Sequence, residues 1–126
     1  MRYALPAAAA LLLLPATPAH ATQGLLCRAA TGATPRISLV IGAGGIAGAS
    51  LDEHGRWVTV GPQAGLTLTQ AWIDREQVLA DIVGPTWERV VRLRVRFDPP
   101  ARGRPNSARG TLTLRGRTYQ VRCEEG

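Results

Sequence analysis

His54, with Asp52 and Glu53 beside it, is the first place in this chain where residue types could support acid–base chemistry or metal binding. A zinc site takes three or four ligands from separate elements, and no second histidine follows residue 21 to complete one. A single polar turn also lacks the orienting partner that catalysis needs. We therefore predict a solvated turn at His54, with no metal, no cofactor and no catalytic residue.

Paired carboxylates are the second candidate, because two acidic side chains facing each other across a sheet can cleave glycosides. Nothing in the spacing of the acidic residues selects one pair. A hydrolase of unrecognised type therefore stays a third-ranked hypothesis, with these residues as its candidates: Asp74, Glu76, Asp81 and Glu88.

The glycines of Gly42-Ala43-Gly44-Gly45-Ile46-Ala47 match the G-x-G-x-x-A pattern of dinucleotide-binding turns. That site needs a helix directly after the glycines, whereas the residues after Ala47 continue a strand pattern up to Asp52-Glu53-His54-Gly55. We interpret this stretch as a hairpin or a bulged strand edge.

Arginine provides the most specific pattern. Arg92, Arg94 and Arg96 alternate with apolar residues and so share one face of a strand, and Arg122 comes from the closing hairpin. Guanidinium groups bind carboxylate and phosphate in a bidentate manner. We predict these four as binding residues for an acidic protein or an anionic envelope polymer. The interleaved aromatic residues of single-strand nucleic-acid binders are absent, which argues against nucleic acid.

An export signal is predicted over Met1–Ala21, because Arg2 precedes an apolar stretch and Ala19-His20-Ala21 matches the A-x-A cleavage pattern. The apolar stretch is too short for a membrane-spanning helix, and no later stretch is longer. We expect a periplasmic or secreted product covering 22–126, one domain with 14 arginines, no lysine and nine acidic residues, a net charge of +5. This charge favours anionic partners.

Short β-branched and aromatic runs separated by Gly, Pro or charged turns predict strands throughout this domain, and the short turns imply antiparallel neighbours. The expected strands are Gly24–Arg28, Arg36–Gly42, Ile46–Leu51, Arg56–Val60, Leu66–Ile73, Gln77–Val83, Glu88–Phe97, Gly110–Leu114 and Thr118–Cys123. Alternation turns Val91, Leu93, Val95 and Phe97 inward. Three prolines and three arginines predict an extended loop over Asp98–Arg109.

Cys27 and Cys123, the two cysteines of an exported chain, predict a disulfide between the first and last strands. In the chain-entropy model a loop of this length is worth about 4.7 kcal/mol. Joining the end strands predicts an all-β fold, a single small antiparallel β-barrel or sandwich of about eight strands.

The early Cys27, the strands Arg36 to Val60 and the stretch Gly61-Pro62-Gln63-Ala64-Gly65-Leu66 leading to Trp72 resemble the periplasmic inhibitors of C-type lysozyme. The resemblance implies a small exported β-barrel with Gly65 in a functional loop and Trp72 in the core. It favours a non-catalytic binding module that inhibits a cell-wall hydrolase such as lysozyme. The alternative is an arginine-rich binder of anionic envelope polymers.

Overall fold

The computed structural model describes residues 23–126, which form one antiparallel sheet of nine strands. The predicted signal segment Met1–Ala21 and its cleavage site lie outside the described residues. The strands are β1 (Gln23–Ala29), β2 (Arg36–Gly42), β3 (Gly45–Asp52), β4 (Trp57–Thr59), β5 (Thr67–Ile73), β6 (Gln77–Val83), β7 (Arg89–Phe97), β8 (Ser107–Leu114) and β9 (Arg117–Glu125), and a 3-10 turn, η1 (Pro62–Ala64), precedes β5.

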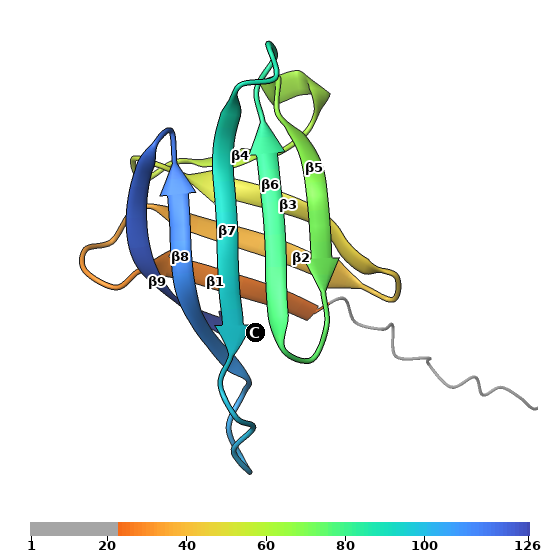
Figure 1. Cartoon of the computed structure of the whole chain (residues 1–126), viewed down its shortest axis with the longest axis vertical. Coiled ribbons are helices and arrows are strands. Elements are labelled where there is room, and N and C mark those ends of the chain that lie inside the picture. The colour runs from red at the N-terminus through yellow and green to blue at the C-terminus, as the bar shows by residue number, and fades with distance from the viewer. Residues whose placement is uncertain (1–22) are drawn as a thin grey trace, which may run out of the picture.

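The strand order β4-β3-β2-β1-β9-β8-β7-β6-β5 places the first and last strands side by side in the middle of the sheet. The sheet curls until β5, β6 and β7 cross in front of β1, β2 and β3 (Figure 1). β3 and β5 approach each other near Gly45 and Ile73 but do not pair. The prediction of an all-β antiparallel fold is confirmed, and the architecture is a curled half-barrel of nine strands.

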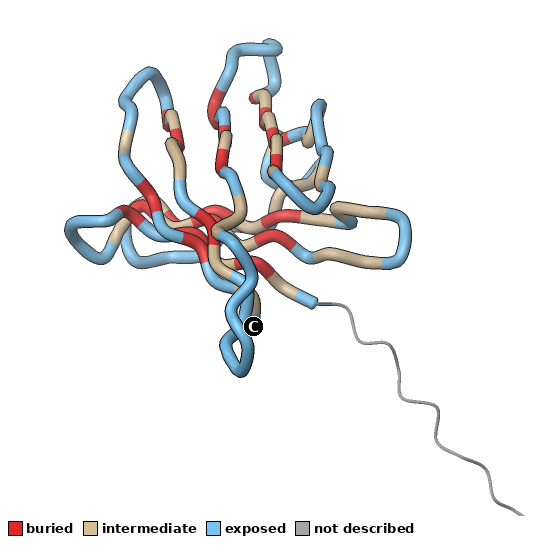
Figure 2. The backbone as a smooth tube through the Cα atoms, turned by 60° about the horizontal axis from the view of Figure 1, so that its bottom comes forward, coloured by how far each residue is buried: buried red, intermediate tan, exposed pale blue. Residues whose placement is uncertain are grey.

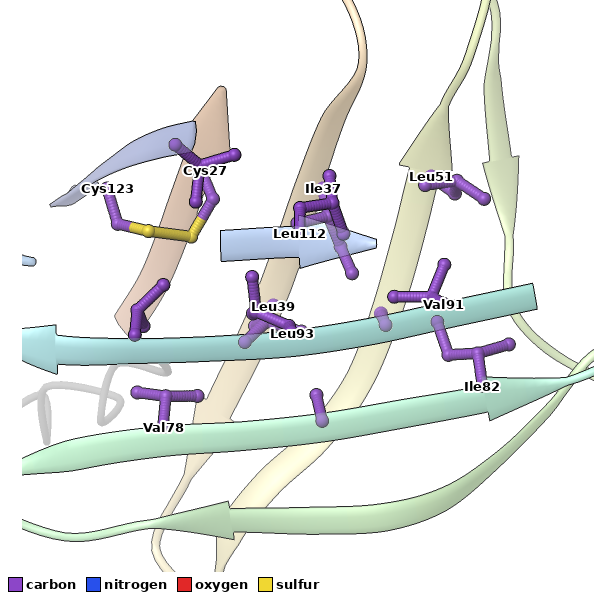
Figure 3. Packing of buried hydrophobic residues seen from close by; sticks show 14 of the residues in the cluster. Cys27, Ile37, Leu39, Leu51, Val78, Ile82, Val91, Leu93, Leu112 and Cys123 are labelled. Atoms are coloured by element: carbon purple, nitrogen blue, oxygen red, sulfur yellow. A yellow bond between two sulfur atoms is a disulfide. The ribbon is translucent and has the colours of Figure 1, made fainter. Parts of the chain in front are cut away.

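Buried positions recur along the strands of both halves of the sheet (Figure 2), and their side chains fill the space between the two halves (Figure 3). Val91, Leu93 and Val95 are buried as predicted and belong to the same core cluster as Ile37 and Leu39 of the opposite half, with Phe97 packed against it. This alternation leaves the arginines of β7 on the convex face.

The Cys27–Cys123 disulfide is confirmed and joins direct cross-strand partners of β1 and β9, with a Cα–Cα distance of 3.9 Å. Both residues are buried on the concave side. The bond therefore fixes the register of β1 against β9 at the centre of the sheet.

Gly110 allows β8 to approach β7 closely. A Cβ at this position would overlap the Arg94 carbonyl and lie 2.7 Å from the Val95 Cα. Any larger residue would force the two strands apart at this point.

The loop between β7 and β8 is shorter than predicted, because β8 begins at Ser107 and the residues from Ser107 to Arg109 are strand. Ser107 and Arg109 both bind the Asp98 carboxylate, and Ala108 pairs with Phe97 and is buried. These contacts extend the hairpin and leave only 98–106 outside it. Among residues 23–126, no helix is long and apolar enough to cross a membrane.

Trp72 does not lie in the core as the lysozyme-inhibitor resemblance implied; it is 53% exposed on the outer face of β5. A register shift between Leu68 and Gln70 inserts one residue into this strand. Such a bulge reverses the faces of all later side chains, so Ile73 turns inward and Trp72 turns outward. The Trp72 indole N–H instead donates to Asp74 at 2.9 Å.

Candidate anion-binding face

Five arginines lie directly opposite one another on five consecutive strands. Arg96 of β7 pairs with Arg109 of β8, Arg109 with Arg122 of β9, Arg122 with Arg28 of β1, and Arg28 with Arg36 of β2. Directly opposite residues of antiparallel strands project from the same face. These five residues, called the arginine row below, therefore cross the convex face in a single line.

The length of the arginine row follows from the sheet itself. Adjacent strands are about 4.8 Å apart, so four steps make a row about 19 Å long with evenly spaced cations. Like charges directly opposite each other destabilise a sheet. Four successive like-charge pairs thus lower the stability of this fold, which points to a role other than folding.

Ion pairs occupy two members of the row. Arg109 contacts Asp98 at 3.0 Å, and its side chain is 70% exposed, so solvent weakens this pair. Arg36 binds the buried Asp52. Within residues 23–126, Arg28, Arg96 and Arg122 form no ion pair and are exposed. Their guanidinium groups are available to an external anion.

Asp52 anchors the β2 end of the row. Burial raises the pKa of its carboxyl, but hydrogen bonds from Arg36 and from the Gly55 and Arg56 amides outweigh burial and hold the pKa below its ordinary value. Arg36 also lies over the ring of Trp57, 4.8 Å from its centre. Because Trp57 pairs with Asp52 across β3 and β4, the aromatic ring continues the line of the arginine row.

Asp98 lies beside the middle of the row. Its hydrogen bond from the Ser107 hydroxyl lowers the pKa of the carboxyl; burial opposes that shift, and the charges of Arg109 and Arg122 reinforce it. Asp52 and Asp98 stay ionised and offset the charges of Arg36 and Arg109. The net positive charge of the row therefore comes from Arg28, Arg96 and Arg122.

Two of the four predicted arginines, Arg96 and Arg122, belong to the row. Arg94 lies one row away and binds both oxygens of Asp81, at 2.9 and 3.2 Å, which fixes it within the sheet. Arg92 is exposed, and the residues directly opposite it on the neighbouring strands are Asp81 of β6 and Thr113 of β8. Sequence reasoning missed Arg28 and Arg36, and it placed Arg109 in the loop before β8 instead of on the strand.

The Gly65 loop lies at another end of the molecule. Gly65 follows η1 with a φ of 69°, and a Cβ there would lie 3.0 Å from Pro85 of the β6–β7 turn. That turn carries Trp87, which is 73% exposed and has a φ of 65°. The two loops together form an exposed tip at the top of Figure 1.

His54 is exposed on the β3–β4 turn, as predicted. Its neighbour Glu53 accepts two hydrogen bonds from Arg115, both at 3.1 Å. In the described part of the chain, no group of three or more His, Cys, Asp and Glu side chains is placed to hold a metal ion.

A hollow of about 550 Å³ opens at the end of the sheet where β5 and β7 end, with Ile41, Ile73 and Phe97 as its apolar lining. The Asp74 carboxylate at its rim accepts hydrogen bonds from the Trp72 indole and from the Glu76 and Gln77 amides, which lower its pKa. Asp98 and Glu125 are likewise bonded within the chain. These carboxylates have fewer free acceptor sites for a ligand than the row has free donors.

No family model, curated protein or solved structure matches this chain. The candidate site therefore stands on its geometry alone.

Proposed function

We propose that this chain is an exported, non-catalytic binding protein that holds an anionic polymer of the cell envelope along its arginine row. The observation that carries the proposal is the register, which aligns five arginines on consecutive strands despite their mutual repulsion. Bidentate recognition by guanidinium suits carboxylate and phosphate groups equally.

The shape of the row favours a polymer over a compact acidic protein. The row is convex and evenly spaced, so a flexible chain with repeating charges can follow it and meet one anion after another. Each exposed contact is weak, because solvent screens it, and affinity comes from the number of simultaneous contacts. A binding role also accords with the acidic residues: Asp81 is paired with Arg94, and Asp74 and Glu88 are bonded to their own turns.

The direct test compares two triple variants with the same change in net charge. Arg28, Arg96 and Arg122 are changed to Gln in one protein, and Arg56, Arg89 and Arg117, which are exposed elsewhere, in the other. Binding of polygalacturonate and of inorganic polyphosphate is then measured at low ionic strength by titration calorimetry. We expect the first variant to lose most of its affinity and the second to keep most of it. Equal losses would mean that net charge, not the row, binds the polymer.

The tip formed by the Gly65 loop and Trp87 supports a second candidate, inhibition of a cell-wall hydrolase such as lysozyme. Backbone hydrogen bonds from the Gly84 amide to Glu88 and from the Trp87 amide to Gly84 order the turn that carries the exposed Trp87 ring. An exposed aromatic residue on an ordered turn is a common anchor in protein interfaces. If this candidate is correct, the parent protein slows lysozyme on cell-wall substrate and Trp87→Ala abolishes the effect. An inactive parent protein would eliminate it.

A further inference from the structure

We infer that the polymer bound by the arginine row is an acidic polysaccharide, whose sugar rings contact Trp57 while its carboxylates lie on the arginines. This inference rests on the proposed function and specifies its ligand class. Phosphate polymers without sugar rings would use the arginines alone.

Trp57 is the first observation behind this inference. It lies at the end of the row, beyond Arg36 and Asp52, and it is 42% exposed even though Arg36 covers part of its ring. An exposed indole offers a flat apolar surface with one polar edge. The C–H groups on one face of a sugar ring match such a surface, whereas a chain of phosphates has nothing to place on it.

Hydroxyl groups provide the second observation. Ser38, Ser50 and Thr59 are cross-strand partners on β2, β3 and β4, and each lies two residues from a member of the Arg36–Asp52–Trp57 line. They therefore form a parallel row on the same face, about 7 Å away. Within residues 23–126 their hydroxyls make no hydrogen bond with another side chain. Free hydroxyls beside an aromatic ring suit the hydroxyl groups of a sugar.

The free cations and the stacking surface lie at different positions along the same line across the convex face. Free cations lie at Arg96, Arg122 and Arg28, and the aromatic ring and hydroxyls lie past Arg36. From Arg96 to Trp57 the line takes six strand steps of about 4.8 Å, so a polysaccharide about 29 Å long would meet charge along most of its length and stacking at one end. The two contributions should therefore be separable by substitution.

The test uses two probes of similar charge density, polygalacturonate and inorganic polyphosphate, on four proteins: the parent, Trp57→Ala, Trp72→Ala and the Arg28/Arg96/Arg122→Gln triple variant. Trp72 is the matched control, since it is also exposed but lies on β5 at the other edge of the sheet. We expect Trp57→Ala to weaken polygalacturonate binding about fivefold to tenfold and to leave polyphosphate binding unchanged. Trp72→Ala should change neither.

A second measurement does not depend on how well the alanine variant folds. In a Trp72→Phe/Trp87→Phe protein, Trp57 is the remaining tryptophan of the sequence, and its fluorescence should shift to the blue with polygalacturonate but not with polyphosphate. Equal responses to both probes would overturn the inference, as would equal losses of both in Trp57→Ala. If the triple arginine variant keeps its affinity for both probes, the proposed function itself fails, which is a different result.

Discussion

Arg28 and Arg122 are direct cross-strand partners on β1 and β9, one residue away from the disulfide-bonded pair Cys27 and Cys123. The disulfide therefore fixes two arginines against each other on the convex face, because neighbouring residues of a strand project to opposite sides. The disulfide and two members of the arginine row therefore depend on the same register between β1 and β9.

Replacing Arg122 should stabilise the fold and weaken polymer binding at the same time. Arg122→Thr removes repulsion with both Arg28 and Arg109 and introduces a good strand former. We expect a gain of about 0.2 to 1 kcal/mol in the free energy of unfolding at low salt, shrinking in about 1 M salt. Urea unfolding measures it, with Arg117→Thr as the control. A loss of stability would show that the row does not repel itself.

The disulfide should supply much of the stability of so small a domain. We expect the double variant Cys27→Ala/Cys123→Ala to lose about 2 to 5 kcal/mol in the free energy of unfolding, because the unfolded chain regains the freedom of a long loop. Urea titrations of the parent, with and without reductant, provide the comparison. Free thiols in the purified, unreduced protein would contradict the bond.

Gly110→Ala should destabilise the sheet, since its new Cβ would overlap the β7 backbone. The expected cost is about 1 to 3 kcal/mol. Gly48→Ala on β3 is the matched control, because a Cβ at Gly48 meets nothing within 4 Å. Equal thermal stabilities for the two variants would mean that β8 does not approach β7 as closely as described.

Acid should destabilise the protein progressively below about pH 4. The pKa values of Asp52, Asp74 and Asp98 are held below their ordinary value of 3.8, and that of Glu88 below 4.5. The unfolded chain thus binds more protons in this range, so the stabilisation is complete above the ordinary pKa values and is lost as pH falls through the folded ones. Melting temperatures measured between about pH 7 and 2 should show a plateau and then a fall. Asp98→Asn should flatten that fall, and a maximum at pH 3 would contradict the assignment.

Much of the fold could be predicted from residue patterns, because alternation and turn residues are local. Val91, Leu93 and Val95 and the Cys27–Cys123 bond are examples. The exposed position of Trp72 could not be predicted, since one inserted residue at a bulge reverses the faces after it and leaves no mark in composition.

Only two of the five arginines in the row were predicted as binding residues, for a related reason. Alternation identified Arg96 and Arg122, but the row depends on register between strands, which is a long-range property. One signal was present: with Cys27 opposite Cys123, Arg28 must lie opposite Arg122. Arg94, by contrast, fits the alternation, but it lies outside the row and its side chain forms an ion pair with Asp81.

Protection of individual arginines from a dicarbonyl reagent, read by mass spectrometry with and without polygalacturonate, tests the central claim most directly. The reagent modifies exposed guanidinium groups, so a bound polymer protects the ones that it covers. We predict protection of Arg28, Arg96, Arg109 and Arg122, with Arg56, Arg89 and Arg117 modified equally in both samples. Protection spread evenly over both groups, or absent from the row, would contradict a polymer bound along the arginine row.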